Sequence, residues 1–138
     1  MQGKTHLVFA LFLSTFFIEP LAWFIILFSS VLPDIDSSTS LLGRHIKIIG
    51  KVFTHRGFFH SFFFFIPVTV LLYSFSSSLA LYFTIGLASH LFLDALTKGG
   101  LRLYPFKKKI KGFVKVGSFL EKLFFFFMVF LFLLRLWF

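Results

Sequence analysis

The sequence contains no cysteine among its 138 residues, only five acidic residues and only four prolines. Without cysteine, a disulfide scaffold and a thiolate-ligated metal site are both excluded. Charged residues make up 14% of the chain and apolar residues 58%, whereas a soluble domain averages about 25% charged. That leaves too little polar surface to cover a globule of this size. The composition therefore excludes a soluble enzyme and predicts a membrane protein.

Long apolar blocks account for most of the chain, and neither a linker nor an internal repeat separates domains. The four blocks run over residues 7–32, 58–73, 79–96 and 119–138. We therefore expect one all-α membrane domain over residues 1–138. It is predicted to be a polytopic integral membrane protein, in which each of the last three blocks forms a transmembrane helix.

The first block allows two interpretations, because Glu19-Pro20 interrupts it. One kinked helix of 26 residues would be about 39 Å long and would place its ends on opposite sides of the bilayer. Alternatively, Glu19-Pro20 is a turn between two helices of about a dozen residues, each short of the ~20 that span a bilayer. We favour this short hairpin, re-entrant or spanning, since it brings His6 and Asp34 to the same membrane face.

Basic residues support the same choice. The net charge is +9, and in the hairpin topology thirteen of the fourteen Lys and Arg residues share one side, leaving only Arg135. The positive-inside rule makes that side cytoplasmic in an inner membrane. Because these residues lie between apolar runs, we expect them to contact anionic lipid headgroups and not nucleic acid. Residues 38–53, with Arg44, Lys47 and Lys51 on one side, predict an interfacial amphipathic helix.

Ionisable residues gather at a few places in the apolar blocks, where they are costly and therefore informative. His6 begins the first block, and the other places are Leu32-Pro33-Asp34-Ile35-Asp36, His55-Arg56-Gly57-Phe58-Phe59-His60-Ser61 and Ser89-His90-Leu91-Phe92-Leu93-Asp94. A helix presents His90 and Asp94 on one face, because they are four residues apart. The hairpins bring all of these segments to one membrane face, so we expect a single site.

The candidate site combines imidazole and carboxylate groups without thiolate, which suits zinc first and manganese or iron as alternatives. We assign Asp34, Asp36, His60, His90 and Asp94 as metal ligands, and His6, His55 and Arg56 as catalytic groups that add ligands, move protons or hold a phosphate. This set exceeds the three or four protein ligands of one catalytic zinc, so we expect one or two divalent ions. Glu19 and Glu121 are expected to face water, and His45 has no partner motif.

Taken in order, these strings resemble the YdjM family of inner-membrane proteins, known as predicted metal-dependent hydrolases. The resemblance rests on Thr5-His6, the Asp34–Asp36 and His55–Ser61 strings and Ser89–Thr97, and it extends to Tyr104-Pro105-Phe106, covering residues 3–106. Residues 119–138 add a further C-terminal transmembrane helix. The resemblance implies a polytopic helical protein with a His/Asp metal site at the membrane surface. This chain departs from the family in its Glu19-Pro20 turn, which makes the first two helices short.

These observations predict a membrane-bound metal-dependent hydrolase that cleaves a phosphoester of a lipid or other interfacial substrate through metal-activated water. Two alternatives stay open. A metal-binding transporter would hold its ion near the bilayer midplane, whereas these motifs lie at the ends of apolar blocks. A non-catalytic scaffold or regulator would bind a partner through the basic helix. Four or five helices make a thin bundle, which is compatible with a homodimer.

Overall fold

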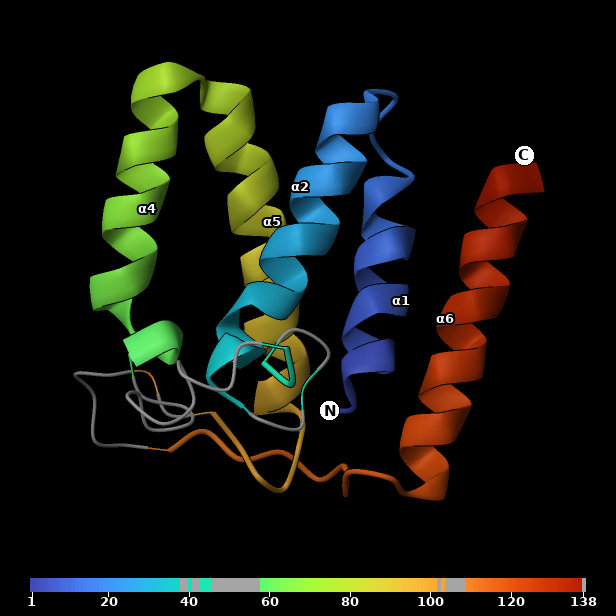
Figure 1. Cartoon of the computed structure of the whole chain (residues 1–138). Coiled ribbons are helices and arrows are strands. Elements are labelled where there is room, and N and C mark those ends of the chain that lie inside the picture. Colours follow the sequence, from blue (N-terminus) through green and yellow to red (C-terminus); the bar gives the residue numbers. More distant parts are fainter. Residues whose placement is uncertain (38–39, 41–42, 46–57, 102, 104–108, 138) are drawn as a thin grey trace.

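The computed structural model describes residues 1–37, 40, 43–45, 58–101, 103 and 109–137. Within these ranges the protein is all-α, as predicted, and no strand forms. The helices are α1 (Gly3–Ser14), α2 (Pro20–Val31), α4 (Phe62–Phe75), α5 (Ser77–Ala95) and α6 (Phe119–Trp137), with short 3₁₀ turns η1 (Leu32–Asp36) and η2 (Phe58–His60). The helices stand side by side, and η1, which follows α2, and the C-terminal end of α5 lie at the same end of the bundle as the N-terminus (Figure 1).

The first apolar block forms the predicted hairpin. α1 ends at Ser14 and α2 begins at Pro20, whose fixed φ and missing N–H suit the first helical position. Each helix has 12 residues, about 18 Å at 1.5 Å per residue. Because the chain reverses between them (Figure 1), His6 near the start of α1 lies at the same end as η1. The alternative of one kinked helix is wrong.

Only one helix in the described part of the chain, α5, is long and apolar enough to cross a membrane by length and composition. The apolar helix α4 is shorter, at 14 residues. α6 has 19 residues, but it includes Glu121, Lys122 and Arg135. Three transmembrane helices therefore remain a prediction. The predicted amphipathic helix over residues 38–53 falls almost entirely outside the described residues.

The closest helix contact joins α5 to α2 at Gly86. A Cβ atom at this position would overlap Ser29 Oγ and the carbonyl oxygen of Ile26. Glycine lets the two backbones approach where any larger side chain would hold them apart. Ile26 is fully buried beside this contact and packs in a cluster with Ala10 and Tyr82, so α1, α2 and α5 share one core.

Residues 109–118, here called the strap, cross the end of α5. Ile110 exchanges two backbone hydrogen bonds with Leu101, at 2.7 and 2.9 Å. The Val114 N–H donates to the Leu96 carbonyl at 3.0 Å, and the Lys98 N–H donates to the Val114 carbonyl at 2.8 Å. The strap thus leads from the end of α5 to the start of α6, which rises beside α1 to the opposite end (Figure 1).

Candidate metal centre

Four separate segments bring five of the predicted site residues together at the end of the bundle where α1 begins and α5 ends. His6 comes from α1, Asp34 from η1, His60 from η2, and His90 and Asp94 from α5. They form two overlapping groups, His6/His90/Asp94 and Asp34/His60/His90, and within each group the candidate ligand atoms lie within 4.8 Å of one another. All three histidines are at most 1% exposed, and Asp94 is 3% exposed. A single buried imidazole–carboxylate cluster results.

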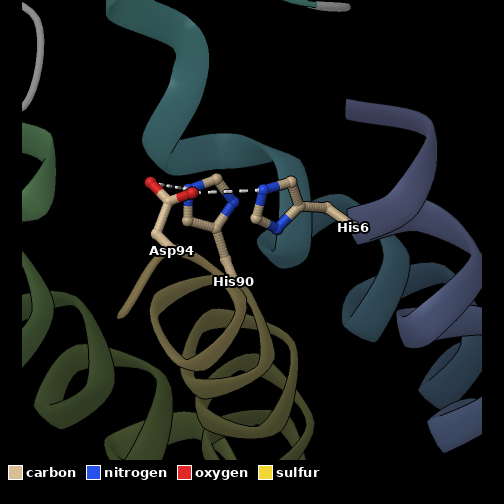
Figure 2. A group of neighbouring side chains, drawn as sticks. All are labelled: His6, His90 and Asp94. Carbon is tan, nitrogen blue, oxygen red and sulfur yellow. Dashed lines mark ion pairs between the residues drawn. The ribbon is translucent and has the colours of Figure 1, made fainter. Parts of the chain in front are cut away.

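Spacings within the cluster fit a shared cation better than direct hydrogen bonds. Figure 2 shows Asp94 facing both His6, from α1, and His90, one turn earlier on α5. His6 Nε2 lies 3.5 Å from Asp94 Oδ1, and His90 Nε2 lies 3.8 Å from Asp94 Oδ2 and 3.7 Å from Asp34 Oδ1. Hydrogen bonds of this kind are about 2.7–3.2 Å long. Four ligands about 2.1 Å from a tetrahedral zinc are about 3.4 Å from one another.

The backbone of α2 fixes the tautomer of His90. Its Nδ1 lies 2.7 Å from the Ser30 carbonyl oxygen, which can only accept, so Nδ1 carries the hydrogen and donates it. The lone pair is then on Nε2, the atom that faces both Asp34 and Asp94. Metal-binding histidines are commonly oriented by such a second hydrogen bond. The contact of α2 with α5 therefore orients His90 so that its Nε2 lone pair could bind a cation.

His6 is buried without hydrogen bonds on its ring. Neither Nδ1 nor Nε2 of His6 has a hydrogen-bond partner among the residues that the structure describes, and the same holds for His90 Nε2. The two rings stack with centroids 4.1 Å apart and planes inclined by 17°. A buried polar group left without a partner costs about 1–3 kcal/mol. A cation between these nitrogens and Asp94 would remove that cost, so the residues present fit a divalent metal.

Asp94 occupies the middle of the cluster. Its Oδ1 faces His6 and accepts from the Met1 amino nitrogen at 2.7 Å, while its Oδ2 lies 3.9 Å from His60 Nε2. The two oxygens thus point to different histidines. Thr97 Oγ1 donates to the Asp94 carbonyl oxygen at 2.8 Å and accepts from the backbone N–H three residues further on, which anchors Asp94 in the last turn of α5.

Comparison with known proteins agrees with the motif order. The family model described as YdjM inner membrane protein matches residues 1–137. The chain belongs to the YdjM inner membrane protein family. A Bacillus subtilis (strain 168) protein, Uncharacterized protein YvsG, is 33% identical over an alignment of 103 residues, and the match covers 68% of this chain and 64% of that protein. The chain therefore spans less than two thirds of that relative. No solved structure matches significantly.

Family membership confirms the predicted resemblance and indicates an inner membrane protein. The other predicted site residues of this YdjM family chain lie elsewhere or are not described. Asp36 is 2% exposed at the end of η1 and belongs to neither of the two ligand groups. His55 and Arg56 lie outside the described residues. His45 is exposed, and its Nε2 accepts from Arg44 Nε at 3.1 Å.

The prediction that Glu121 faces water is wrong. The residue is 2% exposed, and its carboxylate accepts from the Gln2 N–H at 2.5 Å, from Thr5 Oγ1 at 3.1 Å and from the Gly117 N–H at 2.6 Å. Glu121 thereby joins α6 to the residue directly before His6. Ser118 stands three residues before Glu121, which is the spacing of a helix-capping box. This pattern marks the start of α6 in the sequence, but it does not indicate that the carboxylate is buried.

Proposed function

We propose that this YdjM family protein is a membrane-bound metal-dependent hydrolase that cleaves a phosphoester of a lipid or another interfacial substrate. The observation that carries the proposal is the buried His6/His90/Asp94 group, whose ligand atoms are spaced as around a metal ion. His6 Nε2 and His90 Nε2, the nitrogens that face the carboxylates, make no hydrogen bond in the described structure. A divalent ion held there, zinc first with manganese or iron as alternatives, would activate water and neutralise charge on a phosphoryl oxygen.

His90 has a defined role in this proposal and limits how many ions the cluster can bind. His90, oriented by the Ser30 carbonyl, is the ligand whose position is fixed before any ion binds. His90 Nε2 has one lone pair and can bind only one ion. The groups His6/His90/Asp94 and Asp34/His60/His90 therefore cannot each bind a separate ion through His90. A second ion would depend on a carboxylate bridge, and the two oxygens of Asp94 already face different histidines.

Asp34 is the member of the cluster that solvent can reach. Its side chain is 20% exposed, against at most 4% for the histidines and Asp94. We therefore assign Asp34 the exchange of a proton with water, on the side of the cluster from which a substrate would enter. Its Oδ1 lies 3.7 Å from His90 Nε2, close enough to orient a water molecule next to the cluster.

We further propose that the chain is multi-pass, with α4, α5 and α6 spanning the inner membrane and the cluster on the cytoplasmic side. The charge distribution supports this orientation. Lys4, at the start of α1, and the exposed Lys111 and Lys115 of the strap lie at the cluster's end of the bundle, while Arg135 packs on Phe16 at the other end. Such basic groups would attract anionic headgroups to the site.

The position of the cluster along the helices favours hydrolysis over transport. His6 is the fourth residue of α1, and Asp94 is the last but one of α5. A transporter holds its ion near the midplane, whereas these ligands lie at the helix ends, close to the membrane face at which an interfacial substrate would bind. In a scaffold without catalysis, the burial of three histidines would lower the stability of the protein without contributing to its function.

Metal content measured by elemental analysis tests the proposal. The detergent-purified protein, prepared without chelator and offered zinc, should retain one or two equivalents. His6→Ala and Asp94→Asn should each lose the ion. His45→Ala is the matched control, since it removes an exposed imidazole outside the cluster, and it should retain the ion. The loaded protein is then offered phospholipids and soluble phosphoesters, with products identified by mass spectrometry.

Two results would refute parts of this proposal separately. A wild-type protein that stays empty after exposure to zinc, manganese and iron would remove the metal centre. A loaded protein that cleaves none of the phospholipids and phosphoesters in the panel would leave a metal-binding membrane protein without the proposed hydrolase activity. His6 is the most informative site to change, because its ring nitrogens make no hydrogen bond in the described structure, so its loss removes a ligand and little structural support.

A further inference from the structure

An apolar groove of about 550 Å³ lies between α6, the strap and the end of α5. Its lining includes Leu96, Val114, Leu120, Leu123, Phe124 and Phe127, and every residue that lines it is apolar. Pockets for small molecules have volumes of about 300–1,000 Å³ and carry some polar groups to orient the ligand. This groove is of that size but offers shape and apolar contact alone, which matches a hydrocarbon chain.

The groove adjoins the candidate metal centre. The Met1 side chain lines the groove, while the Met1 amino nitrogen lies 2.7 Å from Asp94 Oδ1. Leu96, which also lines the groove, follows Asp94 by two residues at the end of α5. The groove therefore allows a ligand that fills it with its apolar part to place its polar end next to the His/Asp cluster.

Two lysines of the strap neighbour the lining residues of the groove. Lys111 and Lys115 stand on either side of Phe113 and Val114 in the sequence, and both are exposed. The acidic residue of this region, Glu121, is turned inward and bound to backbone N–H groups. An apolar groove with exposed lysines next to its lining residues complements a molecule with a hydrocarbon chain and an anionic head.

We propose that the groove binds one acyl chain of an anionic glycerophospholipid, which makes such a lipid the substrate class of the hydrolase. The substrate role rests on the proposed function, whereas binding in the groove does not. A second copy of this chain is a less suitable occupant, because stable protein interfaces bury roughly 1,200–2,000 Å² and this groove has the dimensions of a small-molecule pocket. The phosphate would lie between the lysines and the His/Asp cluster.

Photolabelling from within the lipid tests the groove without requiring catalysis. The full chain is placed in nanodiscs containing phosphatidylglycerol with a diazirine on one acyl chain, and the labelled residues are located by mass spectrometry. Label should concentrate on Phe124 and Phe127. Leu120→Trp fills the groove and should abolish that label. Leu133→Trp introduces the same side chain at an exposed leucine of the same helix, outside the groove lining, and should keep it.

Zinc content, measured on the same samples, separates this inference from the proposed function. Both tryptophan variants should retain the zinc of the wild type, which also shows that they are folded. Label spread evenly along α6, label undiminished in Leu120→Trp, or cross-links to a second copy in the groove would each overturn the inference. Equal labelling by phosphatidylcholine carrying the same chain would overturn its anionic part. Groove labelling in a protein that binds no metal would overturn the proposed function and leave the lipid site standing.

Discussion

Replacing Gly86 by alanine should weaken the metal centre, although residue 86 contributes no ligand. The added Cβ would lie more than roughly 1 Å inside the ordinary contact range of 3.4–4 Å from Ser29 Oγ and the Ile26 carbonyl oxygen. Four residues further along α5, His90 Nδ1 donates to the Ser30 carbonyl at 2.7 Å. Moving α5 from α2 by about 1 Å would lengthen that bond to about 3.7 Å, which is no longer a hydrogen bond.

Two opposing effects decide the stability of this variant. In an exposed helix, alanine is more favourable than glycine by about 1 kcal/mol, whereas overpacking a close contact costs about 1–3 kcal/mol. One of the two obstructing atoms is a backbone oxygen, which cannot rotate aside as a side chain can. We therefore expect the clash to dominate. Loss of an outer hydrogen bond to a ligand typically lowers metal affinity by about 10–100-fold, and we expect a decrease of that order.

Zinc affinity, measured by competition with a chromophoric chelator, and thermal unfolding in detergent report the two effects on one sample. Ala88→Leu is the control, because residue 88 is exposed on the same helix and the added volume meets only detergent or lipid. It should leave both measurements unchanged. A Gly86→Ala protein that is more stable than the wild type and binds zinc equally well would refute the role of the α2–α5 contact in positioning His90.

Other predictions concern the supports of the cluster. Glu121→Ala should lower stability by about 1–3 kcal/mol, because it leaves the buried Thr5 hydroxyl and two partly buried backbone N–H groups without their acceptor; unchanged thermal unfolding would contradict this. Thr97→Val removes the side-chain anchor of the Asp94 turn, so zinc affinity should fall in the chelator competition while the helical circular dichroism persists. Tyr82→Phe breaks a hydrogen bond at the far end of the bundle and should leave zinc affinity unchanged. Acidification should release the ion, since protons compete for imidazole lone pairs, and dialysis over a pH series measures this.

Local patterns in the sequence predicted that most members of the His/Asp cluster lie together. The four-residue separation of His90 and Asp94 is a property of any α-helix, and it holds whatever α5 packs against. The hairpin followed from Pro20 and from the placement of basic residues, both of which act without knowledge of neighbouring helices. Once the hairpin is accepted, His6 and Asp34 must lie at one end of the bundle, and the structure brings them there.

Tertiary packing determined what the sequence could not indicate. The partner of His90 is the Ser30 backbone carbonyl, and backbone groups carry no mark in a sequence. Asp36 precedes the same loop as Asp34 and looks equivalent in the sequence, yet it lies outside both ligand groups because successive residues of a 3₁₀ turn point in different directions. Glu121 looked like a residue at a membrane surface, and only the packing of α6 on α1 shows the donors it serves.

The free energy of the cluster gives the strongest reason to expect an ion. In the described structure three ring nitrogens of His6 and His90 are buried without hydrogen bonds, at about 1–3 kcal/mol each. That total is a large share of the ~5–15 kcal/mol by which proteins are stable. Structural zinc in small peptides contributes about 10–16 kcal/mol, which is more than the free energy lost by burying these nitrogens without hydrogen bonds. We therefore predict that the cluster is more stable with an ion bound. A chelator should lower the unfolding temperature of the zinc-loaded wild type but not of His6→Ala.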